Sequence, residues 1–172
     1  FKGTLSRRVF YISMSELIIC RPSIQDAFVL PSLFKEAVRT DFSFYNEAVK
    51  ERIIQKNSLR RLLFGRWRRN RIIRIAKVNN NCVGVIVASF NASIGIVHWL
   101  FVLTNYRNQK IGSKLLQEVE SEFKKVGCHK VTLTTEIAPE FYKNLGYGEE
   151  GVLKKHWWGQ DFTILSKNLE KI

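Results

Sequence analysis

Residues 105–116 form a short stretch, NYRNQKIGSKLL, whose side chains could bind an anion. Arg107 and Lys110 carry positive charge. Gly112 lets another group approach the backbone closely, and Ser113 adds a hydroxyl. Because the first turn of a helix presents unpaired N–H groups and a partial positive charge, this stretch predicts a phosphate site. An ordinary turn from a strand into a helix is the alternative, since the stretch is neither a Walker A loop nor a GxGxxG motif.

The elements that would position this loop follow from the apolar pattern of the chain. Residues 94–103 predict a buried strand, and the apolar residues from Ile111 to Val126 recur at helical spacing. Further strands are predicted over 17–20, 71–78, 83–89, 130–134, 148–154 and 162–167, and further helices after a cap at Ser23, over 45–63 with a stop at Gly65, and over 139–145. Helices that interleave with runs of strands predict an α/β fold of the mixed α+β kind, in a single domain over residues 1–172.

The net charge of +13 is unusual, and much of it lies in residues 60–77, RRLLFGRWRRNRIIRIAK. Such a segment could serve an anionic partner such as RNA, a membrane surface or an acidic substrate. The alternative is a solvated helix end followed by a strand edge. We favour this alternative, because the basic residues do not follow a nucleic-acid-binding motif.

The three cysteines and three histidines predict neither a disulfide framework nor a metal site. Cys20, Cys82 and Cys128 are widely spaced with no CxxC pair, so a reducing, cytoplasmic setting is expected. The histidines are too scattered for metal ligation. Residues 82–104 contain no charged side chain, but the turn chemistry of SFNASIG within them favours two buried strands over a membrane span. Residues 1–15 lack a long apolar core, and they are expected to form a leader or an extra strand rather than a signal peptide.

Two motifs in this order resemble those of the GNAT N-acetyltransferase superfamily. The first is the coenzyme A loop, which in the family reads Gln/Arg-x-x-Gly-x-Gly/Ala; here it begins at Arg107 and ends at Gly112, with Lys110 at the first glycine position. The second is APEFYKNLGY, residues 138–147, which resembles a short helix with an aromatic-Tyr pair that ends in Leu-Gly-aromatic. The resemblance covers residues 17 to 169. It implies a GNAT-like acyl-CoA N-acyltransferase fold, a mixed central sheet of about six to seven strands flanked by about four helices.

The resemblance also implies a role for the loop, the preceding strand and Tyr142. In the family a backbone N–H of the fourth strand, where it splays from the fifth, faces the thioester oxygen, and this position corresponds to Val102 or Leu103. Tyr142 would give a proton to the departing thiolate; a core tyrosine under the sheet is the alternative. The residues expected to contact acetyl-CoA are Leu100, Val102, Leu103, Arg107, Asn108, Gln109, Lys110, Ile111, Gly112, Ser113 and Tyr142.

The two motifs do not identify the general base or the residues that bind the acceptor. Some family members use a His or Glu on the fourth strand, and His98 stands there; by alternation it would share a face with Leu100 and Val102. A half-buried structural histidine is the alternative, and Glu136 is the second candidate base. His156 and Trp157, with Trp158, are expected to border the acceptor or, alternatively, to form a surface or dimer patch.

These expectations amount to an N-acetyltransferase that uses acetyl-CoA and no metal. The acceptor would be the primary amine of a small molecule or a protein, and the enzyme a monomer or homodimer that does not enter a membrane. The competing function is that of a non-catalytic protein of the same fold, which binds CoA or docks on a polyanion such as RNA through residues 60–77. Nucleic-acid binding is not favoured, for the reason given above.

Overall fold

The computed structural model describes residues 17–56 and 70–169 of the chain. The elements are β1 (Leu17–Cys20), α1 (Ile24–Asp41), α2 (Glu47–Lys56), β2 (Arg71–Val78), β3 (Asn81–Asn91), β4 (Ile94–Val102), α4 (Ile111–Lys125), β5 (Lys130–Thr135), α5 (Pro139–Lys143), β6 (Gly148–Leu153) and β7 (Phe162–Asn168), with short 3₁₀ turns η1 (Thr104–Tyr106) and η2 (Trp157–Gly159). The predicted order of helices and strands is confirmed. The helix predicted over 45–63 begins two residues later, and its end beyond residue 56 and the stop at Gly65 lie outside the described residues.

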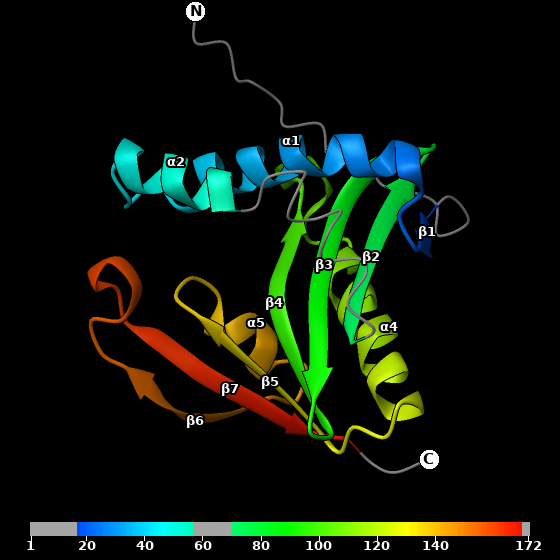
Figure 1. Ribbon diagram of the computed structural model, residues 1–172, viewed down its shortest axis with the longest axis vertical. Coiled ribbons are helices and arrows are strands. Elements are labelled where there is room, and N and C mark those ends of the chain that lie inside the picture. Colours follow the sequence, from blue (N-terminus) through cyan, green and yellow to red (C-terminus); the bar gives the residue numbers. More distant parts are fainter. Residues whose placement is uncertain (1–16, 57–69, 170–172) are drawn as a thin grey trace, which may run out of the picture.

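The strands form one mixed sheet of seven, which confirms the predicted mixed sheet, and their order in it is β1-β2-β3-β4-β5-β7-β6 (Figure 1). Among the strands of the described residues, only β4 and β5 pair in parallel, and α4 connects them. All other neighbours are antiparallel. The position of α4 between two parallel neighbours agrees with the crossover expected for a strand–helix–strand unit.

Local sequence explains where the first elements begin and turn. Ser23 caps α1 in a reciprocal capping box: its Oγ accepts from the N–H of Asp26, and the Asp26 carboxylate accepts from the backbone N–H of Ser23. Asn79 and Asn80 adopt the left-handed backbone that a two-residue hairpin turn requires, so β2 leads directly into β3. Both features were readable in the sequence, since Ser and Asn are the residue types that these positions prefer.

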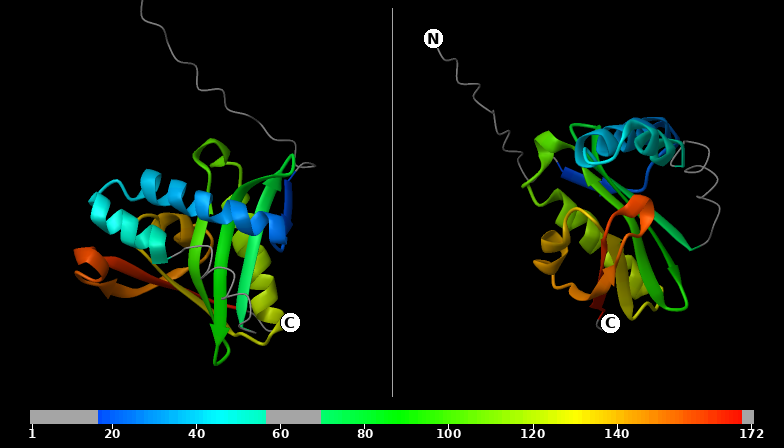
Figure 2. Two further views of the ribbon diagram at one scale, coloured as in Figure 1. Left: turned by 45° about the horizontal axis from the view of Figure 1, so that its top comes forward. Right: turned by 90° about the vertical axis from the view of Figure 1, so that its left-hand side faces the viewer.

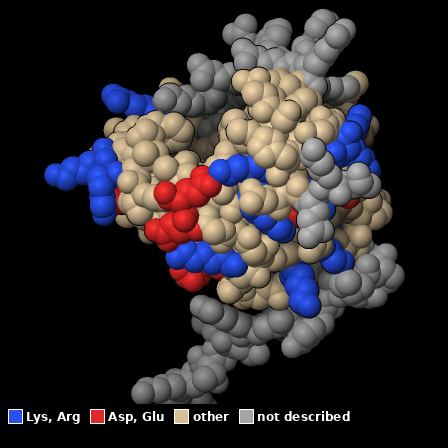
Figure 3. All heavy atoms as spheres, turned by 90° about the horizontal axis from the view of Figure 1, so that it is seen from below, with Lys and Arg blue, Asp and Glu red and all other residues tan. Residues whose placement is uncertain are grey.

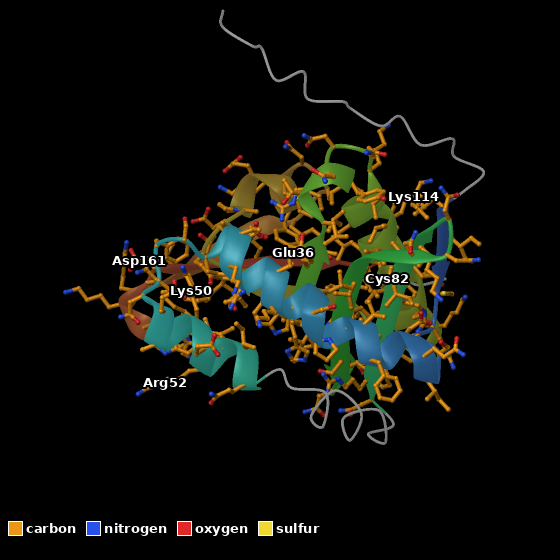
Figure 4. All side chains as sticks on the ribbon, turned by 90° about the horizontal axis from the view of Figure 1, so that it is seen from above. Glu36, Lys50, Arg52, Cys82, Lys114 and Asp161 are labelled. Carbon is orange, nitrogen blue, oxygen red and sulfur yellow. The ribbon has the colours of Figure 1, made fainter. Side chains whose placement is uncertain are left out.

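Helices cover the two faces of the sheet (Figure 2). On one face, α1 packs against β2, β3 and β4 through a core that includes Leu30, Phe34, Val85 and Phe101. Seen from above, α1 crosses over the strands with the exposed Glu36 on its outer side (Figure 4). On the other face, α4 and α5 enclose the larger core. That core consists mainly of aliphatic residues of β2–β5 and α4, with Phe123, Tyr142 and Tyr147 as its buried aromatic members.

The pairing of β4 with β5 is short. It joins Ile94–Val97 to Lys130–Leu133, and after these residues the two strands diverge (Figure 1). A parallel sheet normally buries such strands continuously, so the divergence leaves backbone groups and side chains of both strands open to a ligand. The site described below lies at this point.

The basic segment, residues 60–77, is described in part, and two of its described basic side chains form ion pairs within the fold. Arg74 is buried and forms an ion pair with Glu122 of α4, and Lys77 pairs with Asp26 at 2.7 Å. Viewed from below, several basic side chains of the described residues lie directly against acidic ones (Figure 3). The expected solvated strand edge was wrong for residues 71–77, because β2 is an inner strand between β1 and β3 and Arg74 is buried in an ion pair. Residues 60–69 lie outside the described part of the chain. No helix within the described residues is long and apolar enough to cross a membrane.

Candidate active site

A cleft of about 840 Å³ opens where β4 and β5 diverge. Its walls come from both strands, from the end of α1, from α2, α5 and the loop before β7. The lining residues are Phe42, Ile53, Ile96, Val97, His98, Trp99, Leu100, Thr132, Leu133, Thr134, Thr135, Glu136, Ile137, Tyr142, His156, Trp157, Trp158 and Phe162. All five predicted catalytic and acceptor-site residues, together with Trp158, belong to this wall, so the structure brings them together.

The first turn of α4 is open to an anion. No side chain caps this helix, whose N-cap is Lys110. Asn108 and Lys110 have φ of 62° and 60°, and Gln109 between them does not have a positive φ. Loops of alternating backbone hand can direct successive N–H groups to one side and create an anion-binding concavity. A lysine at the family's first glycine position was expected to fit the loop on a right-handed backbone, and this was wrong: Lys110 adopts the left-handed conformation that glycine favours.

Gly112 lies under a neighbouring aromatic ring. A Cβ built on it would stand 3.3 Å from Cζ of Phe141 in α5. The glycine therefore serves close packing between α4 and α5 as well as access to the helix start. Ile111 is buried, and Ser113 is partly exposed beside Gly112.

The side chain of Arg107 does not face the first turn of α4, contrary to expectation. Its Nη2 donates to both carboxylate oxygens of Asp41 at the end of α1, at 2.8 and 2.9 Å, and its Nε donates to the carbonyl of Val102 at 2.9 Å. The guanidinium also lies over the ring of Phe101, 5.4 Å from its centroid. These contacts fix the Arg107 side chain between α1 and the end of β4. Lys110 is then the basic side chain of the loop that remains for an anion.

The backbone of β4 distinguishes between the two predicted N–H donors. The N–H of Leu103 donates to the carbonyl of Val83 at 2.9 Å and is therefore occupied. Val102 pairs with Gly84, and because antiparallel pairs alternate, the N–H and carbonyl of Val102 point away from β3. The bond from Arg107 to the Val102 carbonyl agrees with this direction. By the same alternation the N–H of Leu100 also faces the divergence.

Tyr142 projects from α5 into the cleft wall and is 8% exposed. Its ring packs edge-on against Phe141 and Tyr147, with centroids 5.0 and 5.9 Å away. Burial, with a smaller contribution from the charge of Glu136, raises the pKa of Tyr142 to about 12. The phenol is therefore protonated throughout the neutral range and able to donate a proton.

His98 occupies a β-bulge, which moves it to a different face from the one expected. Val87 pairs with Trp99 and Ala88 with Val97, so His98 is the extra residue of β4. The prediction that it shares a face with Leu100 and Val102 was wrong: its Nε2 lies 2.7 Å from Oγ of Ser89, while Leu100 and Val102 pack into the core beside α4. Partial burial, and then the charge of Arg71, lower the pKa of His98, so the neutral imidazole dominates at neutral pH.

Glu136 follows β5 and lines the cleft between two tyrosines. Burial raises the pKa of its carboxyl group above the ordinary value. Tyr45, in the turn between α1 and α2, is 5% exposed, and burial together with the Glu136 charge raises its pKa to about 12. The Tyr45 hydroxyl interacts with the Glu136 carboxylate, and this interaction favours the ionised carboxylate and the protonated phenol. Sequence reasoning missed Tyr45, because the aromatic run DFSFY matches no motif.

The loop before β7 closes the far end of the cleft. His156 and Trp157 stack with centroids 5.1 Å apart, and Trp157 and Trp158 meet edge-on at 6.4 Å. All three residues line the cleft. Within the described residues, no group of three or more His, Cys, Asp or Glu side chains could hold a metal ion.

Comparison with solved structures finds this architecture in acetyltransferases. The PaiA N-acetyltransferase of Thermoplasma acidophilum, solved in complex with coenzyme A, is 23% identical and superimposes with a TM-score of 0.77 over 89% of this chain and 99% of that one. An aminoglycoside 6'-N-acetyltransferase complexed with coenzyme A is 20% identical, with a TM-score of 0.67 over 90% and 99%. A ribosomal-protein alanine N-acetyltransferase of Escherichia coli is 13% identical, with a TM-score of 0.69 over 91% and 96%. At these identities the likeness concerns the fold.

No curated protein sequence matches the chain significantly. The family model described as Acetyltransferase (GNAT) family, however, matches residues 31–147, which include β4, the loop, α4 and α5. The resemblance inferred from the two motifs is thereby confirmed. The chain belongs to the GNAT family of acetyltransferases.

Proposed function

We propose that this protein is an N-acetyltransferase that transfers the acetyl group of acetyl-CoA directly to a primary amine. The observation that carries the proposal is the cleft between β4 and β5, with an unpaired backbone edge on one side and the protonated Tyr142 on the other. Acetyl transfer needs these two features together, a donor for the thioester oxygen and an acid for the leaving sulfur. The coenzyme A complexes of two structures with the same fold support the choice of co-substrate.

Binding of the coenzyme is assigned to the start of α4. The free N–H groups of the first turn, with those of the loop from Asn108 to Lys110, would hold the pyrophosphate. The Lys110 side chain adds charge, and Ser113 offers a hydroxyl. Leu100 and Val102 lie along the path from this loop into the cleft. The assignment covers the predicted cofactor-binding residues, except that the Leu103 N–H and the Arg107 side chain have other partners.

The chemistry is assigned to the backbone of β4 near its divergence from β5 and to two side chains that line the cleft, Tyr142 and His98. The Val102 N–H, which points away from β3, would donate to the thioester oxygen as negative charge develops there. Tyr142 would give its proton to the departing sulfur. His98, whose pKa is lowered by burial, would accept the proton of the amine, directly or through water. The N–C bond forms, the C–S bond breaks, and one proton is released to solvent.

The alternative is a protein of the same fold that binds coenzyme A without turnover or docks on a polyanion. Lys110 at a glycine position favours this alternative, but its left-handed backbone is the conformation that a glycine adopts readily. The basic residues 70–77 give no support to a polyanion surface, because Arg74 and Lys77 have acidic partners.

Titration of coenzyme A in a calorimeter, followed by a free-thiol release assay over a panel of amines, tests the proposal. We expect saturable binding and thiol release that depends on the amine. Coenzyme A binding without thiol release from any amine would favour the non-catalytic alternative. Absence of coenzyme A binding would exclude the acetyltransferase and the coenzyme-A-binding form of the alternative. A salt series with single-stranded RNA completes the test: a nanomolar complex that weakens steeply with salt would favour the polyanion function.

A further inference from the structure

The cleft has an aromatic end that the transfer chemistry does not require. Phe42, Trp99 and Trp158 come from the end of α1, from β4 and from η2, and all line the cleft. Phe42 and Trp99 meet edge-on with centroids 6.1 Å apart, and Trp158 meets Tyr45 at 5.7 Å. Trp158 is 36% exposed, which leaves part of its surface available to a ligand. Rings from three separate elements thus form a surface able to enclose a flat apolar group.

The same end carries a single formal charge. Glu136 is the one acidic residue among the described residues that line the cleft, and none of those residues is Lys or Arg. This contrasts with the net charge of +13 for the whole chain. Glu136 also interacts with the buried hydroxyl of Tyr45, which does not itself line the cleft. A carboxylate on the wall of a cleft whose described lining has no other acidic or basic side chain than histidine can pair with one cationic group of a ligand.

We propose that the acceptor is a primary monoamine with an aromatic or similarly flat apolar body, of the arylalkylamine class. This inference rests on the proposed function and specifies its substrate. The ammonium group binds at Glu136, and the apolar body packs against Phe42, Trp99 and Trp158. Transfer converts the amine to its acetamide, with the N–C bond formed, the thioester C–S bond broken and one proton released.

The single acidic side chain of the described lining disfavours two other classes of acceptor. Polyamines and aminoglycosides carry several ammonium groups, and each further group would leave water without a carboxylate to pair with it. The described lining offers only Glu136, so these acceptors would bind less tightly than a monoamine of similar size. The aromatic wall adds apolar contact area that a monoamine with a ring can fill.

A binding experiment without turnover isolates the role of Glu136. The protein saturated with coenzyme A is titrated with 2-phenylethylamine and with its neutral analogue 2-phenylethanol, and tryptophan fluorescence reports binding. A charged hydrogen bond contributes about 1.5–3 kcal/mol, so the amine should bind about 10-fold or more tightly than the alcohol. In Glu136→Gln this preference should fall below about 3-fold, whereas Glu140→Gln, on the exposed side of α5, should keep it. Equal binding of amine and alcohol by the parent protein would overturn the proposal.

A second arm tests the aromatic wall and the substrate class. Trp158→Leu should weaken amine and alcohol alike, and Phe28→Leu, at an exposed position of α1, should change neither. In turnover, 2-phenylethylamine should show a kcat/KM at least about 10-fold above that of spermidine or kanamycin. A higher value for spermidine or kanamycin, or turnover of none of several arylalkylamines, would overturn this inference. Thiol release with another amine would still support the proposed function, and only loss of coenzyme A binding or of all turnover would contradict that function.

Discussion

Arg107 and Asp41 join the coenzyme loop to the end of α1 through two hydrogen bonds of 2.8 and 2.9 Å. A third bond from Arg107 reaches the carbonyl of Val102, the residue whose N–H is assigned to the thioester oxygen. An arginine that sequence similarity places among the phosphate ligands therefore holds the end of β4 in place. We therefore expect Arg107 to influence activity through the position of that strand.

Arg107→Gln should reduce stability and leave coenzyme A affinity nearly unchanged. The ion pair is partly exposed, so we expect the free energy of unfolding to fall by about 1 kcal/mol, as measured by urea denaturation. The variant's kcat should fall while its affinity for coenzyme A, measured by calorimetry, changes less than about 3-fold. A loss of affinity above 10-fold at unchanged stability would assign the side chain to the phosphate after all.

Gly112→Asp should abolish coenzyme A binding. The substitution adds a carboxylate to the first turn of α4, where negative charge would repel a pyrophosphate, and its Cβ would crowd Phe141. Gln117→Asp, which adds the same charge at an exposed position of this helix, is the matched control and should bind normally. Thermal unfolding of both variants separates misfolding from lost affinity. Normal affinity in a folded Gly112→Asp protein would place the phosphates elsewhere.

Tyr142→Phe should lower kcat by about 10²- to 10⁴-fold and keep coenzyme A affinity. The change removes the proton donor and preserves the ring that packs on Phe141 and Tyr147. Tyr106→Phe removes a hydroxyl from the other end of the loop and should remain active. If Tyr142→Phe turns over at the parental rate while chemistry limits that rate, another group protonates the thiolate.

The pH dependence of kcat/KM should show an acid limb below pH 6.5. The base must be unprotonated to act, so activity falls as the pH drops through its pKa, and burial lowers the pKa of His98 from its ordinary value of 6.5. His98→Gln should remove this limb, and His129→Gln, on the exposed connection before β5, should retain it. A limb that persists in His98→Gln and disappears in Glu136→Gln would transfer the role of base to Glu136.

The order of elements could be predicted because each has a local signal. Ser23 and Asp26 specify the start of α1, the asparagines at 79 and 80 specify the hairpin, and helical spacing from Ile111 specifies α4. The two motifs also lie side by side in the fold, because the start of α4 packs against α5, where a Cβ on Gly112 would stand 3.3 Å from Phe141.

What could not be predicted depends on contacts between distant parts of the chain. The bulge at His98 is set by the pairing of β3 with β4, and strict alternation therefore assigned the wrong face. The partner of Arg107 is Asp41, 66 residues earlier, and no local pattern connects them. Tyr45 meets Glu136 only after α1 and β5 have taken their places in the fold.

Mass spectrometry of a single-turnover reaction tests the central claim most directly. The protein is mixed with acetyl-CoA and excess 2-phenylethylamine. After quenching at successive times, the amounts and masses of the product, coenzyme A and the protein are determined. Direct transfer predicts one acetylated amine for each coenzyme A released, with no acetylated protein at any time. Coenzyme A release without an acetylated amine, or an acetylated protein that forms before the product, would contradict the account.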